Sequence, residues 1–262
     1  MSMGNKYGAH RVIEPKGLLP QAAQKIDNTM EIYDNEILID VSALNIDSAS
    51  FRQLWAASEQ DEARLRDMIL GIVAERGKMQ NPVTGSGGML MGTIAQIGSA
   101  LQHRKDIKAG DRIASLVSLS LTPLHIEEIL AVHPEIDRVD IKGQAILFES
   151  GIYAKLPEDM PEALALAALD VAGAPAQTAN IVKPGDSVLI LGAGGKSGML
   201  CGYEAMKRVG PCGNVVGMSR NDKYEKILLD NHFVHKYFVA DAANPVEVLE
   251  KALECNDGKE YD

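Results

Sequence analysis

A glycine-rich turn between an apolar run and a segment of helical periodicity constrains this chain more than any other feature. The apolar run covers residues 188–191, and the turn over 192–198 reads Gly-Ala-Gly-Gly-Lys-Ser-Gly. A short apolar run before such a turn favours a strand buried on both faces, as in a parallel sheet. Glycines let a ligand approach the backbone closely, and the free amides at a helix start bind anions. The sequence therefore predicts a strand, a turn and a helix that together hold a phosphate group.

The spacing of the glycines is typical of a Rossmann unit, which seats the pyrophosphate of a dinucleotide over the turn. Position 197 is serine, so the plain G-x-G-x-x-G pattern is broken, and G-x-x-G-x-x-G fits equally well. A P-loop is excluded by its longer gap, whereas a turn that only packs a helix on a strand is the simpler alternative. The residues predicted to bind the cofactor in this turn are Gly192, Gly194, Gly195, Lys196, Ser197 and Gly198.

The end of the next predicted strand bears on the choice between NAD and NADP. A strand that selects NAD ends in a carboxylate, which binds the ribose hydroxyls. Here the strand over 214–218 is followed by Ser219 and Arg220, and no carboxylate occurs before Asp222. A guanidinium matches a 2′-phosphate well, but Arg220 could equally stack on adenine or be a solvated surface charge. We expect NAD, with NADP possible, and name Ser219 and Arg220 as further cofactor residues.

Strands and helices alternate in the C-terminal part, which predicts a parallel sheet. The predicted strands there are 187–191, 214–218 and 237–239, and the predicted helices are 162–182 (interrupted near 173–175), 196–209, 222–231 and 245–255. The first 150 residues are predicted to be mostly short strands and turns, with a strand over 36–44, a turn over 45–50 and one helix over 58–78. The expected fold is α/β, with a β-rich domain over 1–155 and a Rossmann domain over 156–262.

The predicted parallel sheet has three strands, whereas a doubly wound sheet has six. From this shortfall we expect the chain to be a fragment of a longer protein, or its sheet to be completed by another chain.

Composition excludes some classes of partner. The net charge is −10, so nucleic acid and anionic membranes are repelled. The three cysteines have no regular spacing, the N-terminus has no apolar run of signal-peptide length, and no segment approaches the length of a membrane span. We expect a cytoplasmic protein that acts on a small molecule and forms a homo-oligomer.

Several motifs occur in the order found in the medium-chain dehydrogenase/reductase family. These motifs are Asn35 to Asp47, Ile107 to Ile113, Leu156-Pro157 and Lys183 to Gly195. The resemblance covers residues from about 30 onward and implies a GroES-like catalytic domain followed by a Rossmann domain. Zinc-dependent members have a cysteine near the position of Asp47 and Gly-His-Glu near 85–88, where this chain has Gly-Ser-Gly-Gly. We therefore expect no metal.

The N-terminal segment from Tyr7 to Gln21 and the Gly85 to Thr93 segment are similar to one branch of that family. This branch oxidises L-erythro-3,5-diaminohexanoate to 5-amino-3-oxohexanoate with NAD during lysine fermentation. The resemblance implies the same oxidative deamination here. A zinc-free NADPH-dependent quinone or enone reductase is the alternative enzyme, and an inactive fragment is the alternative of another class.

The reaction needs a general base near the reacting amine, and the substrate carboxylate needs a cation that binds it. Asp47 is predicted to be catalytic from its match to the metal-ligand position, with a turn-closing role equally open. Arg11 and His10 are predicted to bind substrate, with a structural role in the N-terminal arm equally open for Arg11. His125, Glu127 and Glu128 are weaker candidates, while His103 and His133 are expected on the surface and Met89 and Met91 in the core.

Overall fold

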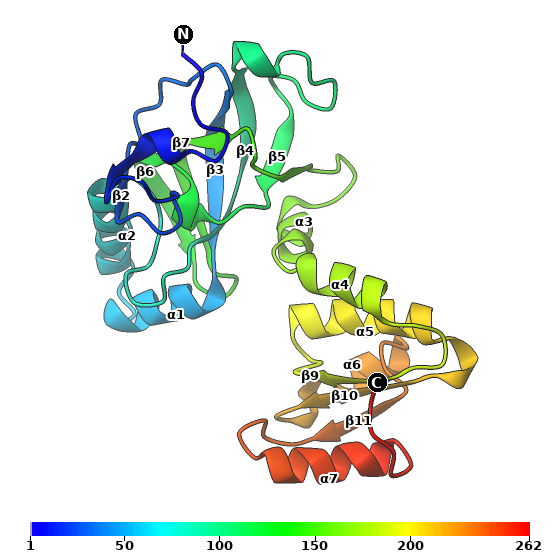
Figure 1. Cartoon of the computed structure of the whole chain (residues 1–262). Coiled ribbons are helices and arrows are strands. Elements are labelled where there is room, and N and C mark those ends of the chain that lie inside the picture. Colours follow the sequence, from blue (N-terminus) through cyan, green and yellow to red (C-terminus); the bar gives the residue numbers. More distant parts are fainter. Residues whose placement is uncertain (1) are drawn as a thin grey trace. The chain divides into compact units, whose positions relative to one another are not determined.

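The computed structural model describes residues 2–262, which form two compact units divided between Asp170 and Val171. The first unit is built on a six-stranded antiparallel sheet, with strand order β6-β7-β3-β4-β5-β8, plus the small β1-β2 pair. The second has a three-stranded parallel sheet of order β11-β10-β9 with helices around it (Figure 1). The expected fold class, a β-rich domain followed by a Rossmann unit, is confirmed.

The elements of the first unit are β1 (Val12–Glu14), β2 (Lys25–Ile26), β3 (Glu36–Ile46), α1 (Ser48–Ala57), α2 (Glu62–Arg76), β4 (Gly88–Ile97), β5 (Arg112–Ser115), β6 (Leu124–His133), β7 (Arg138–Phe148), β8 (Tyr153–Lys155) and α3 (Glu162–Leu169). Those of the second unit are α4 (Gly173–Ile181), β9 (Ser187–Leu191), α5 (Lys196–Val209), β10 (Asn214–Ser219), α6 (Glu225–Asp230), β11 (Lys236–Val239) and α7 (Pro245–Cys255).

The region after β3 differs from the prediction of a turn and one helix over 58–78. Two helices occur instead, because Asp47 and Asp61 each start one by accepting hydrogen bonds from the amides of the following turn. Gly77 ends α2 with a φ of 72°, as its position predicted. The first helix escaped prediction because it buries only Ser50, Phe51 and Leu54, too few for a clear periodicity.

Residues 124–148 form two long paired strands, β6 and β7, rather than the short pieces that were predicted. Buried and exposed positions alternate along much of both strands, since one face covers the core of the unit. That core joins apolar residues of β3, β6 and β7 to Leu65, Ile69 and Val73 of α2. The length of β6 and β7 escaped prediction because their apolar residues are separated by polar ones, which gives only a weak local strand pattern.

The first unit extends past the domain boundary expected after residue 155. Leu166 of α3 is buried in a cluster with Met89, Met91 and Ala114, so α3 packs on the first unit. The two methionines are core residues, as expected. The boundary prediction was placed too early because a change in composition marks where helices begin, not where packing contacts end.

The second unit matches the predicted succession of elements closely. Strands β9 and β10 pair in parallel from Ser187 beside Asn214 to Leu191 beside Met218. Two clusters of apolar residues pack beside its sheet, one including Ala205 and Val209 of α5 and the other Ala252 of α7. The carboxyl ends of all three parallel strands therefore lie at one edge of the sheet, next to the start of α5.

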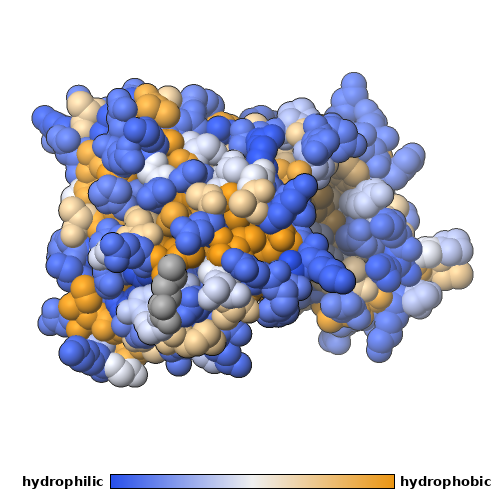
Figure 2. Space-filling view, turned by 90° about the horizontal axis from the view of Figure 1, so that it is seen from above, coloured by the Kyte–Doolittle hydropathy of each residue, from blue (hydrophilic) through white to orange (hydrophobic). Residues whose placement is uncertain are grey.

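The surface is mostly hydrophilic in the face seen in Figure 2, where hydrophobic side chains gather in a smaller patch. Within residues 2–262, no helix is both long enough and apolar enough to cross a membrane.

Candidate functional site

The glycine turn connects β9 to α5, and two of its glycines are required by the protein itself. Gly192 has a φ of +81°, which residues with a side chain rarely adopt. A Cβ on Gly198 would lie 2.4 Å from the carbonyl oxygen of Gly192, so only glycine lets the helix approach the turn this closely. These two positions fix the tight turn and the packing of α5 on it.

The turn is tied to the end of β10 through its own amides. The amides of Gly192 and Ala193 donate to Met218 O at 2.8 and 2.9 Å, that of Gly194 donates to Ser219 Oγ at 2.9 Å, and that of Gly195 donates to Gly192 O at 3.1 Å. These four donors are occupied inside the protein. The amides left to bind an anion over the turn are those that follow, in the first turn of α5.

The start of α5 is open to an anion. Gly195 is the N-cap residue of this helix, and no side chain caps it. The first-turn amides, including those of Ser197 and Gly198, lack acceptors within the helix and carry its positive dipole end.

The space above Gly195 is open in the protein. A Cβ there would meet only Gly192 O at 3.5 Å, so the protein's own packing does not require a glycine. A glycine that packing does not demand, at an open helix start, fits a position where a pyrophosphate must approach the backbone.

A pocket of about 310 Å³ lies beside the turn, at the carboxyl ends of the three parallel strands. Its lining residues are Gly192, Met218, Ser219, Arg220, Asn221, Ala240 and Ala242. No carboxylate lines this pocket. Arg220 is exposed and makes no hydrogen bond or ion pair with any other residue in 2–262. Its guanidinium is therefore available to a ligand.

Asp47 lies in the first unit, where β3 ends and α1 begins. Its Oδ1 accepts hydrogen bonds from the amides of Ala49 at 2.9 Å and Ser50 at 3.4 Å. Its Oδ2 makes no hydrogen bond within residues 2–262, and the side chain is half-buried. One oxygen thus caps the helix while the other can accept a hydrogen bond from a ligand.

The Gly85 to Gly88 loop lies directly beside Asp47. The amide of Asp47 donates to Gly87 O at 3.3 Å, and a Cβ on Gly88 would lie 2.0 Å from Asn45 O. Asp47 and the Gly85 to Gly88 loop are therefore neighbours, and they bring a carboxylate and glycines together. Within residues 2–262, no three His, Cys, Asp or Glu side chains form a group that could hold a metal ion.

Arg11 does not fit its predicted role in substrate binding. Its guanidinium is buried and forms a paired contact with Glu36, with both Nε and Nη2 donating at 2.7 Å. The remaining donors go to main-chain oxygens of Asp27, Thr29 and Glu31. All five donors of the guanidinium are occupied, so none is left for a substrate carboxylate.

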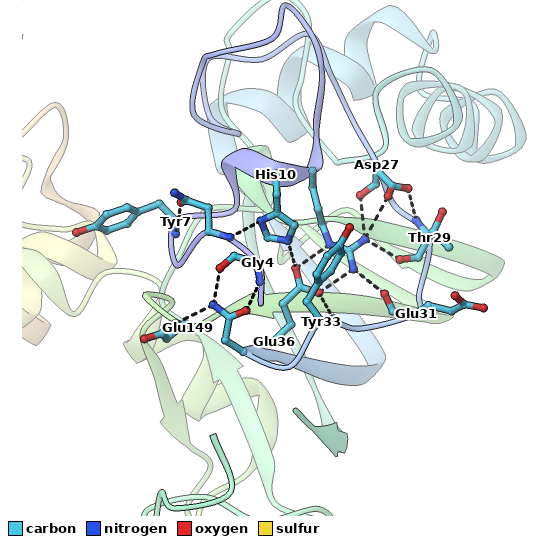
Figure 3. A network of polar contacts seen from close by, with 12 residues as sticks. Gly4, Tyr7, His10, Asp27, Thr29, Glu31, Tyr33, Glu36 and Glu149 are labelled. Atoms are coloured by element: carbon cyan, nitrogen blue, oxygen red, sulfur yellow. Dashed lines mark hydrogen bonds and ion pairs between the residues drawn. The ribbon is translucent and has the colours of Figure 1, made fainter. Parts of the chain in front are cut away.

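His10 is likewise committed to this buried network rather than to substrate. Its Nε2 lies 2.9 Å from Glu36 Oε1, and its Nδ1 accepts from the amide of Asn5 at 2.9 Å. The Tyr33 ring packs edge-on against it (Figure 3). Both His10 and Arg11 therefore attach the N-terminal arm, the segment that precedes β3, to that strand through Glu36.

A second buried cation, which sequence analysis missed, holds the arm further along. Lys78 Nζ donates to Pro20 O at 2.6 Å, and burial lowers the pKa of Lys78 to about 8. Nothing in the sequence marks it, because lysine is ordinarily a surface residue.

The remaining candidates lie at the surface of the first unit. His125, Glu127 and Glu128 are exposed on β6, where Glu127 pairs with Lys142. His103 is exposed, as expected, whereas His133 is only partly exposed and hydrogen-bonds Asp140.

The succession of a β-rich unit and a Rossmann unit is also found in solved quinone oxidoreductases. Similar solved structures include a quinone oxidoreductase of Escherichia coli complexed with NADPH, with a TM-score of 0.52 and 16% identity over 92% of this chain. Another is the CurF ER cyclopropanase from the curacin A biosynthetic pathway, with a TM-score of 0.54 and 16% identity over 90% of this chain. The chain spans 61% and 60% of those two structures, and identities this low establish the fold alone.

The family is established by sequence. The model of the L-erythro-3,5-diaminohexanoate dehydrogenase N-terminal domain matches residues 10–157. Curated relatives of that name from Acetoanaerobium sticklandii and Fusobacterium nucleatum are 66% and 64% identical over 99% and 100% of this chain. The chain spans 75% and 76% of their lengths. This chain belongs to the L-erythro-3,5-diaminohexanoate dehydrogenase family of oxidoreductases, which confirms the branch expected from its N-terminal motif.

Proposed function

We propose that this protein catalyses the oxidative deamination of L-erythro-3,5-diaminohexanoate to 5-amino-3-oxohexanoate with NAD, in lysine fermentation. The observation that carries this proposal is the 66% identity, over 99% of the chain, to a relative named for this dehydrogenase activity. The open helix start above Gly195 supports a dinucleotide cofactor.

The reaction balances as an oxidation followed by hydrolysis. A bound nicotinamide supplies the chemistry of hydride acceptance from the carbon that carries the 3-amino group. The resulting iminium takes up water and releases ammonia, which leaves the 3-oxo product, a proton and the reduced cofactor. The carbon gives up hydride more readily when its amine is neutral than when it is protonated. The protein must therefore hold the amine beside a group that takes up its proton.

Asp47 is our candidate for the group that faces the substrate amine. Its unbonded Oδ2 can accept a hydrogen bond from the amine or take up its proton. The helix-capping bonds to Oδ1 hold the carboxylate in one orientation.

Replacing Asp47 with asparagine tests this role, because asparagine caps a helix as well as aspartate but cannot take up a proton. We expect kcat to fall by roughly 100-fold or more, the usual contribution of a positioned acid or base. The matched control is Asp61→Asn, which makes the same change at the start of α2 and is expected to leave kcat unchanged. A kcat for D47N close to that of the control variant would remove Asp47 from the mechanism.

The cofactor is NAD in this proposal, but the pocket at the strand ends does not exclude NADP. No carboxylate there repels a 2′-phosphate, and the unpaired guanidinium of Arg220 attracts one. We infer that both cofactors bind and that Arg220 governs their ratio.

The variant Arg220→Ala is expected to reduce kcat/KM for NADP by roughly 10-fold to 100-fold, because a charge-assisted contact to phosphate is lost. The corresponding value for NAD should change by less than about 3-fold. Arg208→Ala, at an exposed arginine near the end of α5, controls for a general effect of lost charge. Equal losses with both cofactors would show that Arg220 does not read the 2′-phosphate.

The activity itself is tested by incubating the protein with L-erythro-3,5-diaminohexanoate and either cofactor. We expect the reduced cofactor and ammonia to appear in equal amounts. Absence of both products, together with reduction of a quinone or an enone by NADPH, would replace this proposal with the reductase function of proteins that share the fold.

We further propose that the protein acts in the cytoplasm as a homo-oligomer. Its three cysteines are all unpaired, which fits a reducing compartment. Light scattering of the purified protein would measure the oligomeric state, and a monomer at micromolar concentration would contradict it.

A further inference from the structure

One side-chain hydrogen bond joins the glycine turn to the end of β10. Ser219 is the last residue of β10, and it is buried with 9% of its surface exposed. Its Oγ accepts the hydrogen bond from the amide of Gly194 at 2.9 Å. The other three amides of the turn donate to main-chain carbonyls. This bond is therefore the one link between the turn and β10 that depends on the identity of a side chain.

Gly194 is confined from a second direction as well. A Cβ on Gly194 would lie 2.3 Å from the ring of Tyr224, so this ring packs directly against the backbone there. The peptide is thus held by the Ser219 hydroxyl and the Tyr224 ring. Gly195 follows at once and is the N-cap of α5. The orientation of the amides at the start of α5 therefore depends on where this peptide is held.

Ser219 also lines the pocket at the strand ends, together with Arg220. A serine hydroxyl has one hydrogen to donate and two lone pairs, of which Gly194 uses one. Within residues 2–262, the hydrogen of Ser219 Oγ has no protein acceptor. It is free to donate to an oxygen of a ligand in the pocket.

We propose that Ser219 is a positioning residue that links the glycine turn, which lies under the cofactor's pyrophosphate, to the place of the adenosine ribose. Its Oγ accepts from Gly194 and so sets the turn under the pyrophosphate, while its hydrogen is donated to the adenosine ribose or to a phosphate on it. This proposal rests on the dinucleotide cofactor of the proposed function. Unlike Arg220, Ser219 acts on NAD and NADP alike, because the turn lies under the pyrophosphate that both contain.

The proposal is tested without any substrate by measuring the binding of NADH and NADPH to the whole chain in a fluorescence titration. Ser219→Ala is expected to raise both dissociation constants by about 10-fold, the effect of losing one buried hydrogen bond. Ser219→Thr keeps the hydroxyl and should bind within about 3-fold of the original protein. Ser187→Ala is the matched control, since it removes a hydroxyl at the opposite end of the same sheet.

Hydrogen exchange of the Gly194 amide is the second readout, and it does not depend on the cofactor. Exchange should be faster in Ser219→Ala and unchanged in Ser187→Ala and Ser219→Thr. If Ser219→Ala does not fold, Ser219→Cys retains the volume with a weaker acceptor and should show the same two effects in smaller measure.

Three results would overturn the proposal. They are unchanged binding in Ser219→Ala, equal weakening in Ser187→Ala, and weakening confined to NADPH. Failure of the proposed function is distinguishable, because a chain that binds NADH through Ser219 but does not oxidise the diamino acid retains this inference and loses only the reaction.

Discussion

Replacement of Gly195 by alanine is expected to abolish tight cofactor binding while leaving the fold intact. The added methyl group meets no protein atom closer than 3.5 Å, so the native structure accommodates it. It would occupy the space that a pyrophosphate needs above the start of α5. A displacement of the reacting groups by about 1 Å lowers the reaction rate on the order of 100-fold, so we expect kcat/KM to fall at least that much.

The measurement is NADH binding alongside the midpoint of thermal unfolding. Gly71→Ala provides the matched control, because a Cβ there meets nothing within 4 Å and α2 lies in the other unit. Gly198→Ala provides the contrast, since its Cβ would lie 2.4 Å from Gly192 O and should destabilise the protein. Normal cofactor affinity in Gly195→Ala would show that the pyrophosphate does not lie over this turn.

Replacement of Arg11 by methionine is expected to produce the largest loss of stability. Arg11 and Glu36 are both 1% exposed, and their closest atoms are 2.7 Å apart. Removing one partner of a buried ion pair leaves an uncompensated charge and costs about 3–5 kcal/mol. For a protein of this size that corresponds to a fall of roughly 10 °C in Tm.

Arg64→Met is the control, since Arg64 pairs with Glu59 at the surface with both side chains more than half exposed. That variant should change the free energy of unfolding by less than about 1 kcal/mol. The double variant Arg11→Met with Glu36→Gln should be less destabilised than the sum of the single changes, because no unpaired charge remains buried. Additive losses would show that the two side chains stabilise the arm independently.

Local patterns predicted the second unit well. The succession from β9 to α7 follows from short apolar runs, helical periodicity and the glycine turn, all signals within a few residues of one another. The same kind of signal located Gly77 at the end of α2. Predictions failed where the deciding contact lies far away in sequence, as for α3, which Leu166 attaches to residues 89–114.

The substrate-binding role expected for Arg11 shows why a motif does not reveal the function of its residues. The motif correctly identified the family, but a conspicuous arginine in it could bind substrate or hold the arm. Only its five occupied hydrogen-bond donors decide between them. Lys78 gave no sequence signal at all, although it is buried and bonded to Pro20.

The sequence by itself determined the fold class and the glycine turn, because glycine spacing and strand-to-helix periodicity are properties of neighbouring residues. It also determined the family, through motifs that resemble those of known members. The tertiary structure alone decided that Ser219 holds Gly194, that Asp47 lies against Gly87, and that Arg11 is buried. The physical reason is that hydrogen-bond partners and burial depend on which distant segments pack together, and no local pattern specifies those contacts.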